Sequence, residues 1–151
     1  MQLRDEGNIS NLKFENINMD LRCFEPVSYW GKAEPIAITN ISWFKNLCHG
    51  KISNIFFNNI VADTENGLFL YTDNYGDINN IKLNNIYLNI HKKTKWELGF
   101  HDLRPAEGFG IIKTMLNVIY SNNVENLEYN NFKYDIDDAV LNIKGEDFKF
   151  E

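Results

Sequence analysis

The chain has 151 residues and a formal net charge of −6, and 44% of its residues are hydrophobic. That is the size of one domain with enough apolar side chains for a core, and the acidic balance argues against nucleic acid as a partner. No apolar run is long enough to cross a membrane, and no basic start followed by an apolar segment indicates a signal peptide, so the sequence leaves the cellular compartment open.

From its beginning, the chain repeats one pattern four times, with the polar and apolar positions in the same order. The copies start at Gly7, Gly50, Gly76 and Asn122, and the first reads Gly-x-Ile-x-Asn-Leu-x-Phe-x-Asn-Ile. Self-similarity of this kind indicates a solenoid. Asparagine fills two fixed columns of the repeat: Asn11 and Asn16, Asn54 and Asn59, Asn80 and Asn85, and Asn126 and Asn131.

Within one copy, the alternation of Leu12 and Phe14 is typical of a strand with one buried face, and the apolar spacing does not follow a helix. Asparagine tolerates left-handed backbone, so the two columns fit bends on either side of this strand. When coils stack, each column of side-chain amides can form a ladder. The pattern therefore predicts an all-β chain folded as a parallel β-helix, with a single domain over residues 1–151.

The distances between the copies suggest a number of coils. The second and third copies are 26 residues apart, which is one coil, whereas the spacings of 43 and 46 on either side each indicate two coils. Diverged strands are then expected at residues 36–38 and 111–113, and additional strands at residues 68–71 and 139–143. The sum is about six coils.

Compositional bias and a leucine-rich repeat could each produce part of this pattern. The chain has 23 asparagines, which codon usage in an AT-rich genome would produce, but composition alone does not align asparagine in two columns. A leucine-rich repeat has a similar core spacing, but it requires a regularly placed asparagine and a helix-like return, and neither is regular here. The β-helix is the better prediction.

The ends of the chain lack an evident cap. The first repeat begins at Gly7 with no amphipathic helix before it, and the chain stops shortly after its last expected strand. A terminal coil without a cap exposes apolar interior and an unpaired strand edge. We therefore expect the carboxy-terminal part of a longer solenoid, or an open end covered by another subunit, either in a homo-oligomer or by pairing with an amino-terminal portion.

Three stretches between the repeats sharpen this interpretation. Residues 4–12 read RDEGNISNL, residues 29–36 read YWGKAEPI, and Lys95-Trp96 is followed by DLRP at residues 102–105. Together with the repeat, they resemble the late coils of glycoside hydrolase family 28, which acts on pectin. The resemblance implies a right-handed parallel β-helix whose full enzyme hydrolyses galacturonide linkages of an acidic, pectic polysaccharide with inversion.

The catalytic aspartates of that family are expected to be absent from this chain, whose own catalytic residues are unknown. The family holds them in Asn-x-Asp and Asp-Asp motifs, so that one carboxyl group protonates the leaving oxygen and another activates water. Asp137-Asp138 resembles the second motif but stands close to the end of the chain, where an acidic turn is the better interpretation. His49, before Gly50, is interpreted as a turn residue because no partner carboxylate lies at a suitable register.

Two loops combine aromatic rings with charged groups, as sugar sites do. A ring stacks on a pyranose and a cation binds the carboxylate of a uronate, for which the planar fork of Arg104 is best suited. The structural alternative is that Trp30 closes its own loop while Lys32 and Glu34 form a surface pair. The candidate substrate-binding residues are Trp30, Lys32, Glu34, Trp96, His101, Asp102 and Arg104.

Other side chains are interpreted structurally. His101 and Asp102 are neighbours on an expected strand, so their side chains should point apart. Cys23 and Cys48 are too few for a disulfide framework and lack metal-site spacing, so buried thiols are expected and neither a metal nor a cofactor is. Five phenylalanines are expected in the core: Phe24, Phe44, Phe57, Phe69 and Phe109.

The sequence leaves alternative functions open. One is a non-catalytic carbohydrate-binding or structural β-helix module, and another is a trimeric stalk like those of tail fibres. A calcium-dependent pectate lyase would need a carboxylate cluster, but alternation along a strand would separate Asp135, Asp137 and Asp138 onto different faces.

Overall fold

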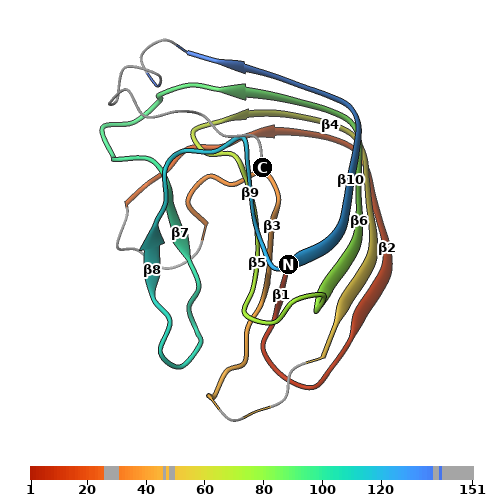
Figure 1. Ribbon diagram of the computed structural model, residues 1–151. Helices are drawn as coiled ribbons and strands as arrows, with labels where there is room; N and C mark the ends of the chain where they lie inside the picture. Colours follow the sequence, from red (N-terminus) through yellow and green to blue (C-terminus); the bar gives the residue numbers. More distant parts are fainter. Residues whose placement is uncertain (26–30, 46, 48–49, 138–139, 141–151) are drawn as a thin grey trace.

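The computed structural model describes residues 1–25, 31–45, 47, 50–137 and 140. In these residues the chain is all-β, and most of its strands run parallel, as the repeat predicts (Figure 1). The strands in chain order are β1 (Gln2–Leu3), β2 (Ile9–Asp20), β3 (Ala37–Asn40), β4 (Ile52–Thr64), β5 (Leu68–Thr72), β6 (Ile78–Ile90), β7 (Phe100–Asp102), β8 (Ile111–Lys113), β9 (Ile119–Asn122) and β10 (Val124–Ile136).

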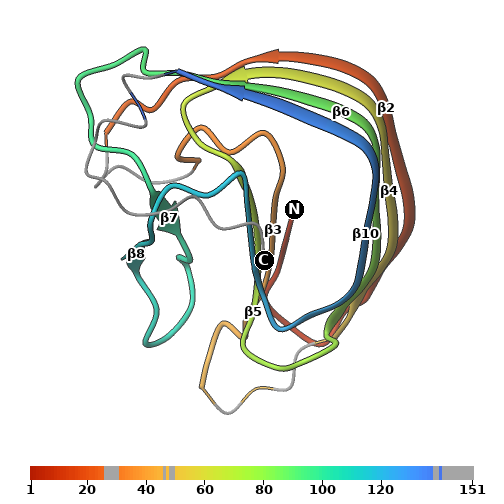
Figure 2. The same ribbon diagram turned by 45° about the horizontal axis from the view of Figure 1, so that its top comes forward.

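Two parallel sheets face each other across the core. The long, bent strands form one sheet in the order β10-β6-β4-β2, and the short strands form the other in the order β1-β3-β5-β9 (Figure 2). Each strand of the short sheet is followed along the chain by a strand of the long sheet. This arrangement is compatible with the predicted β-helix.

The register between the long strands keeps the repeats aligned. Ile9 pairs with Ile52, Ile52 with Ile78, and Ile78 with Val124, and the same alignment continues along each strand. The spacings of 43 and 46 residues are therefore single steps between adjacent long strands, and the expectation of two coils in each was wrong. In the interval of 46 residues, the extra length includes the β7–β8 hairpin, which lies outside the two parallel sheets, since a loop can grow without disturbing the pairing on either side.

The segments expected to be diverged strands have different roles. The strand expected at residues 36–38 is present as the start of β3, which belongs to the short sheet, and residues 111–113 are β8, which pairs antiparallel with β7 outside both stacks. The strand expected at 68–71 is confirmed as β5. The strand expected at 139–143 lies outside the described residues, apart from Val140.

The two asparagine columns adopt the backbone that the sequence predicts. All eight have positive φ, between 49° and 58°, so each long strand bends twice. In the first column, the side chain of Asn54 donates to Asn11 at 3.2 Å, Asn80 to Asn54 at 3.2 Å, and Asn126 to Asn80 at 3.1 Å. The predicted ladder is therefore confirmed, with every amide donating toward the previous rung.

The second column is less regular, and a third ladder lies beside it. Asn59 donates to Asn16 at 2.6 Å and Asn131 to Asn85 at 2.8 Å, but Asn85 donates to Asn58 at 3.1 Å. A further series begins at Glu15, and each later member donates to the one before it: Asn58 to Glu15, Asn84 to Asn58, and Asn130 to Asn84. The sequence pattern did not reveal this column because its first member is a glutamate.

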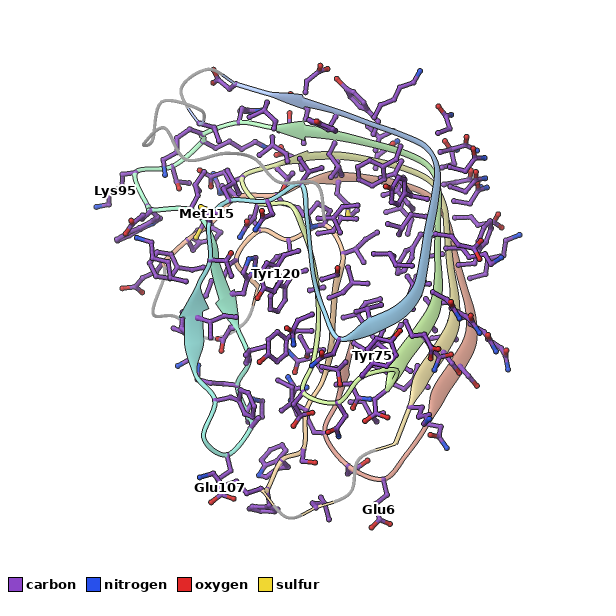
Figure 3. All side chains as sticks on the ribbon, in the orientation of Figure 1. Glu6, Tyr75, Lys95, Glu107, Met115 and Tyr120 are labelled. Atoms are coloured by element: carbon purple, nitrogen blue, oxygen red, sulfur yellow. The ribbon has the colours of Figure 1, made fainter. Side chains whose placement is uncertain are left out.

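Stacked aliphatic side chains fill the space between the sheets (Figure 3). Ile55 and Ile81 lie side by side on the adjacent strands β4 and β6, and both are fully buried. Each such side chain contributes roughly 1.5–3 kcal/mol by leaving water. Leu68 and Leu70 of β5 close this core from the short sheet.

The outer face of the short sheet carries a second, smaller core. Phe69 of β5 packs there with Ile41 and Leu103, and Tyr120 of β9 stacks on Phe69 with ring centroids 5.5 Å apart. The β7–β8 hairpin covers this face (Figure 1). The hairpin thus brings Arg104 and the residues that follow it beside the segment after β3.

Candidate functional site

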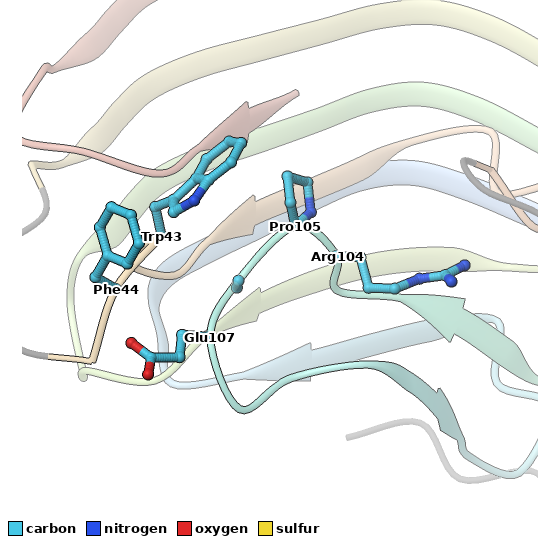
Figure 4. Close-up of a pocket in the computed structure, with 6 residues that line it drawn as sticks. Trp43, Phe44, Arg104, Pro105 and Glu107 are labelled. Carbon is cyan, nitrogen blue, oxygen red and sulfur yellow. The ribbon is translucent and has the colours of Figure 1, made fainter.

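A pocket of about 470 Å³ opens between the segment after β3 and the loop joining β7 to β8 (Figure 4). Trp43 and Phe44 form one wall, and their side chains are 47% and 60% exposed. Arg104, Pro105, Ala106 and Glu107 line the other wall. An exposed ring beside polar groups offers an apolar face on which a sugar can stack.

Backbone hydrogen bonds join the two walls of the pocket. The Glu107 N–H donates to the Trp43 carbonyl at 2.8 Å, and the Lys45 N–H donates to the Glu107 carboxylate at 3.0 Å. The Trp43 N–H in turn donates to the Arg4 carbonyl at 2.8 Å. The aromatic wall is therefore positioned by the first residues of the chain and by the hairpin loop together.

The buried Arg4 side chain fastens the hairpin to the short sheet. Its guanidinium donates to the Pro105 carbonyl at 3.1 Å and to the Thr39 hydroxyl at 2.8 Å. Burial lowers the pKa of Arg4, an effect that the nearby Asp102 carboxylate opposes. Because the bond to Pro105 joins segments 101 residues apart in the sequence, Arg4 holds one pocket wall at a fixed place relative to the core.

Arg104 lines the pocket, but its guanidinium points away from Trp43 and Phe44 (Figure 4). Its Nε and Nη2 atoms donate to the two oxygens of Asp102 at 2.8 Å and 2.7 Å. Burial raises the pKa of Asp102, but the side-chain and backbone bonds from Arg104 outweigh it and hold that pKa below its ordinary value. The fork predicted to bind a uronate carboxylate is thus bonded to a carboxylate of the chain itself.

Glu34 and His101 form a separate, buried pair. His101 Nδ1 lies 2.8 Å from Glu34 Oε1, and the imidazole stacks on Phe69 with centroids 4.0 Å apart. Lys32 is only 1% exposed, and its ammonium donates to the Glu25 carbonyl at 3.2 Å. Lys32 and Glu34 are therefore buried, and the surface pair of the structural alternative is wrong. The contact between Glu34 and His101 joins the segment just before β3 to the hairpin.

The structure brings some of the predicted binding residues together and separates others. Glu34 contacts His101, and Asp102 contacts Arg104. Trp96 lies apart from these pairs; it is half-buried, and the Lys95 ammonium lies 4.7 Å from its ring centroid. His101 and Asp102 bond different partners, as expected for neighbours on a strand. Trp30 lies outside the described residues.

Trp43 was not among the predicted binding residues, and the prediction for Phe44 was wrong. Phe57 and Phe69 are buried as expected and Phe109 is half-buried, but Phe44 and Phe24 are exposed. Residues 43 and 44 form bends after β3 rather than a strand, so alternation along a strand could not place these two rings.

The remaining positions considered in the sequence are the acidic pair near the end of the chain, His49 and the two cysteines, and only some of them lie within the described residues. The Asp137 carbonyl accepts from the Val140 N–H at 2.8 Å, while Asp138, His49 and Cys48 lie outside the described part. Cys23 is buried, as expected, and burial raises the pKa of its thiol. Across the described ranges, no cluster of three acidic, histidine or cysteine residues could hold a metal. These same residues include no helix long and apolar enough to cross a membrane.

Comparison with known proteins found no matching protein-family model, curated protein or solved structure. The function is therefore argued from the pocket and its chemistry.

Proposed function

We propose that this chain binds carbohydrate, and that the pocket formed by Trp43, Phe44 and Glu107 is the binding site. The observation that carries the proposal is the pair of exposed rings facing a carboxylate. A sugar ring presents an apolar face that stacks on an aromatic ring, and its hydroxyls donate to carboxylate oxygens. The Glu107 carboxylate accepts one backbone N–H and has lone pairs for such hydroxyls.

The ligand class that we propose is a pectic polysaccharide, and the fold a right-handed parallel β-helix like the carboxy-terminal coils of a family 28 glycoside hydrolase. The support for both is the resemblance of residues 4–12, 29–36 and 102–105 to that family, together with the parallel stacks. The pocket itself adds a constraint on the pose. Glu107 repels a uronate carboxylate, so the stacked sugar must turn its carboxylate away from Glu107.

In this proposal the chain contributes binding and not bond cleavage. Inverting hydrolysis requires one carboxyl group that protonates the leaving oxygen and a second that activates water. Asp102 is bonded to Arg104 and Glu34 to His101, so neither carboxylate faces the pocket as a general base would. A non-catalytic binding module is the alternative to a part of a larger hydrolase, and both share the same pocket.

Binding can be measured by isothermal titration of the purified chain with oligogalacturonates and with neutral oligosaccharides of the same length. Trp43→Ala should weaken binding about two- to tenfold, since a stacking contact is worth roughly 0.5–1.5 kcal/mol. The same samples, assayed for reducing ends, should show no release.

Tyr75→Ala is the matched control, because Tyr75 is 71% exposed at the turn between β5 and β6, away from the pocket (Figure 3). Its affinity should equal that of the unsubstituted chain. No binding of any oligosaccharide, or equal losses in both variants, would contradict the proposed site. Release of reducing ends that Asp138→Asn abolishes would instead make Asp137-Asp138 a catalytic motif.

A further inference from the structure

The two outermost long strands each leave apolar side chains exposed at an end of the stack. Leu12 of β2 is 40% exposed and Tyr129 of β10 is 55% exposed. Their columns are otherwise closed, since Ile55 and Ile81 beside Leu12 are fully buried, and Leu83 beside Tyr129 is 1% exposed. Within the described residues, β2 and β10 each pair with a long strand on one side only. A further rung at either end would bury the exposed members as the inner rungs are buried.

We propose that a second copy of this chain supplies that rung, with the β2 edge of one copy pairing in parallel with the β10 edge of the next. The arrangement is head to tail and uses two different surfaces. It is independent of the carbohydrate site, which lies at the segment after β3 and the hairpin loop.

The direction of the asparagine ladder favours this occupant. Each amide in the first column donates toward β2, so Asn126 on β10 ends the series with its oxygen turned toward the missing rung. At the other end, the Asn11 amide nitrogen reaches only the neighbouring Ser10 hydroxyl, at 3.4 Å. Asn11 of a second copy therefore presents the donor that Asn126 lacks, in the same column and at the same backbone bend.

Charge and shape along the two edges also match. Lys13 of β2 and Glu128 of β10 occupy the same outward column, so the new rung would place opposite charges side by side. In the inner column Phe14 would meet Tyr129, repeating the stack that Phe14 makes with Phe57 at 5.0 Å.

One outward column opposes the contact, because Asp20 and Asp135 would become neighbours. Each of these carboxylates already has a partner, since Lys93 lies 2.5 Å from Asp20, and the Tyr87 hydroxyl donates to Asp135 at 2.5 Å. Their repulsion is exposed to solvent, and salt screens it as it screens the attraction between Lys13 and Glu128.

A head-to-tail contact is open-ended, so one interface generates chains of copies rather than a closed dimer. An isologous contact, β2 against β2, would stop at two copies. The average mass in solution should therefore keep rising with protein concentration, which separates the two geometries.

The test uses one charge on each edge and light scattering after size exclusion. Leu12→Lys blocks the β2 edge, and Tyr129→Lys blocks the β10 edge. Each variant alone should remain a single chain at concentrations where the unsubstituted protein associates. Mixed in equal amounts, they should form two-chain complexes and nothing larger, because each contributes the one edge that the other has lost.

Val61→Lys is the control, because Val61 is 42% exposed on the outer face of β4 and belongs to neither edge. It should associate as the unsubstituted chain does, and thermal melts should show all three variants folded. If the unsubstituted protein has the mass of a single chain at every concentration, the proposal is overturned. A Tyr129→Lys variant that still associates alone would also overturn it, and would indicate an isologous contact through β2.

Discussion

Asn80 and Asn84 lie on the same strand and both belong to ladders, but only Asn80 has positive φ, at 53°. Asn80→Ala loses two ladder bonds and also places a β-carbon without a polar side chain in left-handed backbone, which costs about 1–2 kcal/mol. Asn84→Ala loses its two ladder bonds and keeps ordinary backbone. The first substitution should therefore reduce the free energy of unfolding by about 1 kcal/mol more than the second, as measured by urea denaturation.

Asn80→Gly separates the two contributions at that bend. Glycine accepts the left-handed backbone but makes no ladder bond, so its loss should approach that of Asn84→Ala. If Asn80→Ala and Asn80→Gly were equally destabilising, the backbone at the bends would not be the reason that asparagine fills these columns.

Glu65 is a second residue whose local bonds carry stability. Its side chain is fully buried and accepts the backbone N–H groups of Cys23, Lys93 and Thr94, at 2.6, 2.8 and 2.7 Å. Burial raises the pKa of Glu65, but these bonds outweigh it and hold that pKa below its ordinary value of 4.5. The folded state therefore gains stability above pH 4.5, which is lost as the pH falls through the lowered pKa of the folded protein.

Glu65→Gln removes this titration. The variant should be less stable at pH 7 by roughly 1–3 kcal/mol, because its amide group meets donors where an acceptor is needed. Between about pH 5 and pH 3 it should lose less stability than the unsubstituted chain, when both are unfolded with urea. An unchanged slope in this interval would mean that other carboxylates, such as Asp102, account for the acid sensitivity.

At the residue scale, the sequence predicted the repeated positions and not the singular ones. The asparagine columns could be predicted because all four copies of the repeat need left-handed backbone at the same two positions. Arg4, Trp43 and Glu65 each occur once, and their partners lie on distant segments, so no spacing reveals them. Asp102 and Arg104 are only two residues apart, but the sequence does not distinguish two side chains that bond each other from two that bind a ligand.

At the scale of an element, the space around the first position of the repeat is smaller inside the stack than at its end. A β-carbon on Gly50 would lie 1.8 Å from the Gly7 carbonyl oxygen, which is backbone and cannot move aside. A β-carbon on Gly7 would meet only side chains, at 3.4 Å or more. Gly50→Ala should therefore lower the melting temperature strongly, while Gly7→Ala should leave it nearly unchanged.

This pair also tests whether β2 pairs directly with β4. If the spacing of 43 residues contained another coil, Gly7 would not lie under Gly50, and the two substitutions would have similar effects. The sequence could not decide this, because a loop and a diverged coil of equal length leave the same interval between repeats. Pairing register is set by burial of the aliphatic columns, which a loop outside the stack does not change.

At the scale of the whole molecule, stability should be graded along the stack, because β4 and β6 pair on both edges whereas β2 and β10, within the described residues, pair on one. In dilute solution, amide hydrogen exchange should be slowest in β4 and β6, faster in β2 and β10, and fast in the short β7–β8 hairpin. If copies associate head to tail, raising the protein concentration should slow exchange in β2 and β10 together and leave the hairpin unchanged. Slowing in β2 alone would indicate an isologous contact, and slowing in the hairpin would place the interface over the carbohydrate pocket. Amide exchange in β2 and β10 can slow together only when the β2 edge of one copy covers the β10 edge of another. The exchange pattern therefore tests the pairing itself, which the mass of the complex alone does not.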